Sequence, residues 1–101
     1  MATYLNNLAT LLRDTGRYED AEPLYRRALS IDEKSLGSNH PSVATDLHNL
    51  GILLHDTGRE NEGIELLLRA YQIMVKSLGP DHPSTRLIYK SLLSWGQPPE
   101  K

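Results

Sequence analysis

The segment KSLGSNHPS at residues 34–42 returns almost unchanged as KSLGPDHPS at residues 76–84. The two copies are offset by 42 residues, so that Gly37 matches Gly79 and His40 matches His82. A fixed period of about 20–50 residues is typical of stacked repeat architectures. In such folds each unit buries its apolar surface only against its neighbours. We therefore expect the function to lie on surfaces that the units share.

Composition limits the classes of function. The chain has 101 residues, a net charge of −2 and no cysteine, which fits one small domain and excludes disulfides and thiolate chemistry. The charge balance argues against binding to nucleic acid or to an anionic membrane. No apolar run is long enough to span a bilayer. A cytoplasmic location is the default expectation.

The spacing of apolar residues predicts five helices. Gly16 fits the left-handed C′ position that ends many helices. Pro41 fits the first turn of the third helix, with His40 or Asn39 as its cap. The predicted helices cover residues 1–15, about 18–36, about 41–57, about 60–78, and Pro83 to near Trp95 and Gly96.

The repeat predicts how these helices are arranged. Residues 1–42 and 43–84 are identical at 22 of 42 aligned positions. Two helices per unit, joined by short glycine-containing turns, predict antiparallel helix pairs stacked side by side. The predicted fold is an all-α solenoid over residues 1–96, in which the last helix, 83–96, is a C-terminal cap. The tail 97–101 has no apolar residue to bury and is expected to be disordered.

Small residues are expected where the paired helices cross closely. Leu93 occupies the matching position of the last helix, which suits a helix that no partner follows. The chain begins directly at the start of a helix, so we expect upstream repeats in the full protein. The expected close contacts are Ala9 with Ala21 and Ala28, and Gly51 with Gly63 and Ala70.

These features resemble the tetratricopeptide repeat (TPR), and the 42-residue length and Leu-Gly-x-x-His-Pro connectors resemble its kinesin-light-chain type. The second repeat departs from the pattern at Gly63, Glu65 and Leu67. The resemblance implies a superhelix whose first helices line a concave groove for an extended peptide or a partner's helix. It implies no catalytic, cofactor or metal site. The positions that match the family signature are Leu5, Leu8, Ala9, Leu12, Gly16, Ala21, Tyr25 and Ala28.

The resemblance also assigns groove residues, position by position. Asn7 and Asn49 recur on equivalent turns, and each amide can donate to and accept from a peptide backbone. The alternative is that these two residues bond neighbouring helices and set the angle between repeats. Basic residues that would grip a chaperone tail are missing, because Leu87 and Ser91 occupy their positions. The groove residues are Thr3, Asn6, Asn7, Thr10, Arg13, Asp14, Thr45, His48, Asn49, Ile52, His55, Asp56, Leu87, Lys90, Ser91 and Ser94.

Two motifs that suggest enzymes have a structural explanation. The aspartic-protease triplet Asp-Thr-Gly occurs at residues 14–16 and 56–58. Each copy is predicted to end a helix, whereas the protease needs two loops that bring their carboxyl groups together. His40 and His82 are expected to lie about one repeat apart, too far to share a zinc ion. We therefore expect neither protease activity nor a metal site.

One further feature is not required by the repeat. Ile64, Leu68, Tyr71 and Val75 form a second apolar stripe on the fourth helix, where the second helix is mostly charged. An apolar surface of this kind usually contacts something. Either the last helix and Trp95 cover it, or it binds a protein. The alternative function is thus a structural segment that caps the solenoid and self-associates weakly through this stripe.

Overall fold

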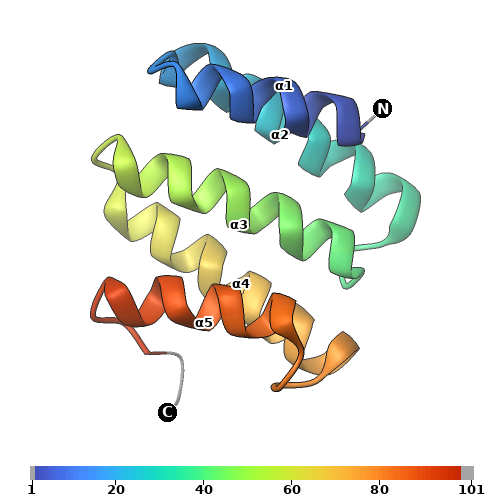
Figure 1. Ribbon diagram of the computed structural model, residues 1–101. Coiled ribbons are helices and arrows are strands. Elements are labelled where there is room, and N and C mark those ends of the chain that lie inside the picture. Colours follow the sequence, from blue (N-terminus) through green and yellow to red (C-terminus); the bar gives the residue numbers. More distant parts are fainter. Residues whose placement is uncertain (1, 99–101) are drawn as a thin grey trace.

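The computed structural model describes residues 2–98, which contain five helices and no strand. Helices α1, α3 and α5 lie side by side in one layer, and α2 and α4 lie behind them in a second layer (Figure 1). The predicted all-α solenoid of antiparallel helix pairs is confirmed. The helices are α1 (Ala2–Asp14), α2 (Tyr18–Leu36), α3 (Pro41–Asp56), α4 (Glu60–Leu78) and α5 (Pro83–Ser94).

The first helix of each pair ends in the same hydrogen-bonded turn. Gly16 adopts a φ of 85°, its N–H donates to the carbonyl of Arg13 at 3.0 Å, and the N–H of Arg17 donates to Leu12 at 2.8 Å. This is the 6→1 and 5→2 pattern of a Schellman motif. The Thr15 hydroxyl donates to the Leu12 carbonyl at 3.0 Å. The Thr and Gly of the Asp-Thr-Gly triplet therefore close the helix.

The connector between pairs starts the next helix through a histidine. His40 is the N-cap of α3, and its Nδ1 accepts a hydrogen bond from the N–H of Ser42 at 3.0 Å. His82 caps α5 in the same way, through the N–H of Ser84 at 3.1 Å. This bond satisfies one of the helix's free N–H groups. Of the two predicted cap residues, His40 is therefore the one used.

The core follows the stack as consecutive buried clusters. Ala9 and Ala21 share one cluster with the fully buried Tyr25. In the second pair the backbones approach closely, because a Cβ atom added to Gly63 would lie 2.6 Å from the carbonyl oxygen of Gly51. The predicted close contact between these two glycines is confirmed. Ala28 lies in a separate cluster with Ala2 and Leu5.

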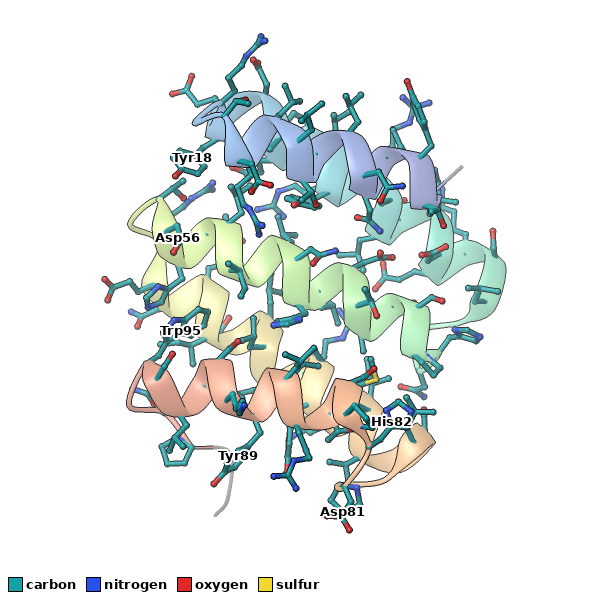
Figure 2. All side chains as sticks on the ribbon, in the orientation of Figure 1. Tyr18, Asp56, Asp81, His82, Tyr89 and Trp95 are labelled. Carbon is teal, nitrogen blue, oxygen red and sulfur yellow. The ribbon has the colours of Figure 1, made fainter. Side chains whose placement is uncertain are left out.

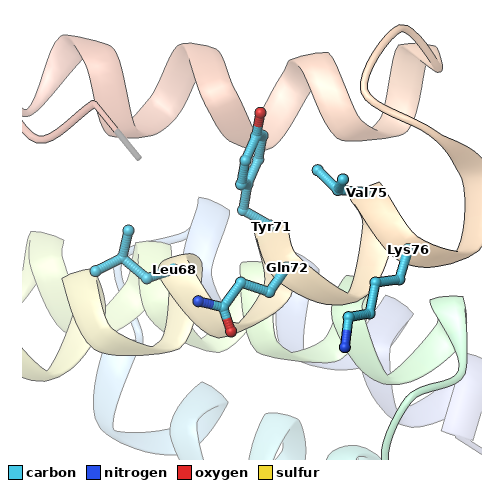
Figure 3. A pocket seen from close by; sticks show the side chains of 5 residues that line it. All are labelled: Leu68, Tyr71, Gln72, Val75 and Lys76. Carbon is cyan, nitrogen blue, oxygen red and sulfur yellow. The ribbon is translucent and has the colours of Figure 1, made fainter. Parts of the chain in front are cut away.

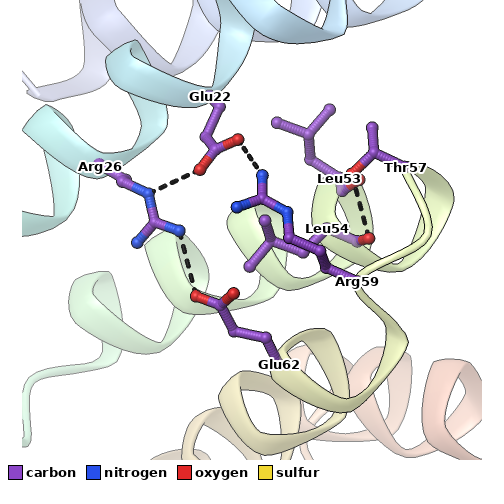
Figure 4. Close-up of polar contacts among 7 residues, drawn as sticks. All are labelled: Glu22, Arg26, Leu53, Leu54, Thr57, Arg59 and Glu62. Carbon is purple, nitrogen blue, oxygen red and sulfur yellow. Dashed lines mark hydrogen bonds and ion pairs between the residues drawn. The ribbon is translucent and has the colours of Figure 1, made fainter.

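Ion pairs connect the two helices of the outer layer, α2 and α4. Glu22 accepts hydrogen bonds from Arg26 on its own helix at 2.9 Å and from Arg59 (Figure 4). Arg26 also donates to Glu62 at 3.1 Å. Partial burial acts to raise the pKa of Glu22, but the hydrogen bonds from the two arginines lower it overall. Farther along the same face, Arg69 donates to Glu33 at 2.8 Å.

The end of the chain is described only in part. Gln97 and Pro98 are exposed and lie outside any helix. The rest of the predicted tail, 99–101, lies outside the described residues.

Candidate functional site

The layer of α1, α3 and α5 forms the face on which the sequence places the groove. Thr3, Asn7 and Asp14 are exposed on α1, as are Thr45 and Asp56 at equivalent positions of α3. Figure 2 shows Asp56 and Trp95 at the same end of this layer.

Two side-chain hydrogen bonds connect consecutive helices of this layer. The Asn6 amide donates to Asp46 Oδ1 at 2.7 Å, which joins α1 to α3. His48 Nε2 and Ser91 Oγ lie 3.3 Å apart, which joins α3 to α5. Asn6 and His48 occupy the same position of their repeats, so the same position connects both pairs of helices.

The neighbouring amides of Asn7 and Asn49 are not used in this way. Asn7 is exposed and Asn49 is half-buried. Within residues 2–98, neither amide has a hydrogen-bonding partner. The alternative role predicted for these residues was to bond neighbouring helices. Asn6 and His48, one position earlier in each repeat, make that connection instead.

The other predicted groove residues on α1 divide into two groups. Thr10 is half-buried, and its hydroxyl lies 2.8 Å from the Tyr25 hydroxyl on α2. Arg13 donates to the adjacent Asp14 at 3.3 Å, and both remain near solvent. Thr10 therefore supports the helix pair, whereas Arg13 and Asp14 give charge to one end of the face.

On α3 and α5, packing takes up part of the predicted set. Ile52 packs against the core cluster. The rings of His55 and Trp95 stack with their centroids 3.8 Å apart, which attaches the end of α5 to α3. The Thr45 hydroxyl donates to the Pro41 carbonyl at 3.3 Å. Among the remaining predicted residues, Lys90 is exposed, and it lines a cavity between α4 and α5 together with Tyr71 and Leu93.

Two titratable groups lie between the helices of the face. Burial, helped by the charge of Arg13, lowers the pKa of His48. Burial and the nearby Asp32 carboxyl together raise the pKa of Asp46 to about 7, while the Asn6 hydrogen bond opposes the change. Asp46 is only 1% exposed, and its Oδ2 has no hydrogen-bonding partner. Asp46 is not among the residues predicted from the sequence. The repeat alignment did carry a signal, because a charged residue stands there at the position of Tyr4 and Ile88.

The apolar stripe of α4 is covered in part. All four of its residues are half-buried. The rings of Tyr71 and Tyr89 lie 6.1 Å apart, so α5 covers the middle of the stripe. Leu68, Tyr71 and Val75 also line an open cavity of about 360 Å³ (Figure 3). Partial cover by the last helix and an accessible apolar surface therefore coexist.

The described residues offer little for other chemistry. No cluster of three or more His, Cys, Asp or Glu side chains in residues 2–98 could hold a metal ion. None of the five helices is both long and apolar enough to cross a membrane.

Comparisons with known proteins agree with this architecture. The family model for the tetratricopeptide repeat matches residues 1–62 and 47–95. No curated protein matches the chain. The solved structures of TPR-like, nearly identical repeats from a candidate kinesin light chain of Podosopora anserina, and of a point variant of it, are similar to this chain. Both are 26% identical and cover 93% of it, with TM-scores of 0.78 and 0.77.

These matches confirm the predicted kinesin-light-chain type of repeat. The chain spans 46% of the length of the two solved structures. TPR repeats generally mediate protein–protein interactions and are typically non-catalytic scaffolds. Because the family model covers most of the sequence in two overlapping matches, the chain belongs to the tetratricopeptide repeat family.

Proposed function

We propose that this chain is a protein-interaction module whose concave face, formed by α1, α3 and α5, binds an extended segment of a partner protein. The observation that carries the proposal is the pair of unused amides, Asn7 and Asn49, at the same position of consecutive helices. An amide supplies both a donor and an acceptor, as an extended peptide backbone requires. Two such groups one repeat apart would fix the path of the peptide across the helices.

The rigidity of the face supports this role. The bonds from Asn6 to Asp46 and between His48 and Ser91 hold adjacent helices at a set spacing. A binding surface that is already ordered loses less conformational entropy when a ligand binds.

The face also favours a particular ligand composition. Leu87 of α5 is 60% exposed at the position where α1 and α3 carry Thr3 and Thr45. The ligand is therefore expected to place an apolar side chain against α5. Near the ends of α1 and α3, it would meet Asp14 and Asp56, which favours a basic or polar residue there.

The test begins with a displayed library of random peptides selected on the 101-residue chain. Selected peptides are then measured by fluorescence anisotropy against the double variant Asn7→Ala and Asn49→Ala. The loss of two peptide hydrogen bonds, at about 0.5–1.5 kcal/mol each, is expected to weaken binding by roughly 5- to 150-fold. Asn61→Ala is the matched control, because Asn61 is exposed on α4, away from the concave face.

Thermal unfolding of the same variants separates binding from stability. The double variant should keep the melting temperature of the parent chain, since its amides bond nothing within the described fold. Unchanged peptide affinity would refute the proposal, as would a fall in melting temperature that accounts for the lost binding.

A further inference from the structure

A groove open to solvent begins on the exposed side of α4 and continues between α4 and α5. Two adjoining cavities, of about 360 and 400 Å³, share Tyr71 as a lining residue. Leu68 and Val75 line the first, and Tyr89 and Leu93 of α5 line the second. The floor of the groove is thus mostly apolar, and Leu93 is 52% exposed.

The internal repeat shows what normally packs on this face of a second helix. In α2 the equivalent face contacts the second helix of the next unit, α4 with its N-cap Arg59. The contacts include the pairs Glu22–Arg59 and Arg26–Glu62 (Figure 4). Farther along, Glu33 pairs with Arg69. On α4 the same face carries the apolar stripe, and no helix follows α5 within residues 2–98. The apolar stripe of α4 therefore lies where a following helix would pack. It would contact that helix through apolar side chains, whereas α2 contacts α4 through ion pairs.

This position determines the shape of the occupant. At about 100° per residue, Glu62 and Arg69 of α4 and its N-cap Arg59 lie on one side of the helix, nearly opposite its apolar stripe. A helix that packs on the stripe as α4 packs on α2 would carry apolar residues at those three positions. The occupant is therefore a helix with a continuous apolar face, as in other helix-in-groove complexes.

The charges around the groove determine the rest of its chemistry. Lys76 lines the first cavity, Arg86 and Lys90 line the second, and no Asp or Glu lines either one. These cations are concentrated in a chain whose net charge is −2. We infer that the α4–α5 groove binds an amphipathic helix of a partner protein, with acidic residues along the edges of its apolar face. This inference does not rest on the function proposed for the concave face.

The test uses designed peptides of known composition. A labelled helix of roughly 16 residues, about 24 Å long, spans the stripe. Leucines at positions i, i+3, i+7 and i+10 form its apolar face, and the flanking positions carry Glu in one peptide and Lys in a second. Fluorescence anisotropy with the 101-residue chain is expected to show at least roughly tenfold tighter binding of the Glu peptide, with a preference that weakens as salt rises.

Two variants of the chain locate the binding site. Leu68→Glu is expected to weaken binding of the Glu peptide at least roughly tenfold, because it places a charge in the apolar floor. Lys76→Glu should reduce the preference for the Glu peptide without altering the core. Lys34→Glu is the matched control, since Lys34 is exposed at the same position of the first repeat, outside the groove.

Several results would overturn the inference. One is equal binding of the two peptides, and another is an effect of Lys34→Glu as large as that of Lys76→Glu. Sedimentation provides a third, because a dimer of the parent chain that Leu68→Glu abolishes would make a second copy the occupant. If Leu68→Glu unfolds the chain, as judged by circular dichroism, the Lys76→Glu result alone decides between support and refutation.

Discussion

Replacement of Asp46 by Asn is expected to stabilise the fold, and to do so only where the carboxyl group would be ionised. Asp46 is buried between α1 and α2, its Oδ1 accepts from Asn6, and Asp32 and Glu33 of α2 add negative charge nearby. Its pKa is about 7, against an ordinary value of 3.8. The folded state therefore holds the proton more tightly than the unfolded state does.

The sign and size of the effect follow from this difference. The stabilisation from the raised pKa is complete below about pH 4 and is lost as pH rises to about 7. At 1.36 kcal/mol per pH unit, the loss amounts to about 2–4 kcal/mol at pH 8. Asn keeps the acceptor for Asn6 and has no charge to bury. The Asp46→Asn variant should therefore exceed the parent chain by about 2–4 kcal/mol at pH 8 and by little at pH 4.

The assay is urea unfolding of both chains, followed by circular dichroism at several pH values between 4 and 8. Asp81→Asn is the control, because Asp81 is exposed and the first repeat carries Asn39 at the same position. The control should show no divergence of this kind with pH. A gap between Asp46→Asn and the parent chain that does not grow with pH would refute the argument, and so would a less stable Asp46→Asn at pH 8.

Two further predictions test the packing. Gly63→Ala should lower the free energy of unfolding in urea by about 1–2 kcal/mol, because the added Cβ would lie 2.6 Å from the Gly51 carbonyl oxygen. The resulting strain of about 1–3 kcal/mol is only partly offset by the better helix propensity of Ala. An unchanged urea midpoint would show that α3 and α4 separate freely. Leu53→Ala should lower the free energy of unfolding by about 2–5 kcal/mol, because the Leu53 side chain is only 1% exposed. Leu11 occupies the equivalent position of the first repeat but is 59% exposed, so Leu11→Ala should change the free energy of unfolding by less than about 0.5 kcal/mol. Equal losses would mean that another molecule covers α1 in solution.

The helices and their ends could be predicted closely from the sequence, because short-range physics determines them. Gly16 and its counterparts end helices at positive φ, which few other residues tolerate. Pro41 and Pro83 begin helices where a missing N–H costs least. Each signal lies within a few residues of its effect, and the repeat presents most of them twice.

The arrangement of polar side chains on the face of α1, α3 and α5 could be predicted only in part. The sequence placed Asn6 and Asn7 on the same face but could not assign one to the neighbouring helix and the other to solvent. That division depends on Asp46, which lies 40 residues from Asn6 and pairs with it only after the repeats stack. Likewise, the contact of His55 with Trp95 depends on where α5 ends.

The two layers of the solenoid contribute differently to its specificity. The positions that are buried in the first repeat are buried in the second as well, as Leu5 and Leu47 illustrate, so a core of this kind would accept many neighbouring repeats. The outer layer is less permissive, because Glu22 and Arg26 of α2 require complementary charges on the next second helix, and α4 supplies them. Mismatched charges at such contacts disfavour incorrect neighbours. A copy of α4 placed on the apolar stripe would leave its Arg59 and Glu62 without those partners. We therefore expect the groove between α4 and α5 to favour a helix whose composition differs from that of α4.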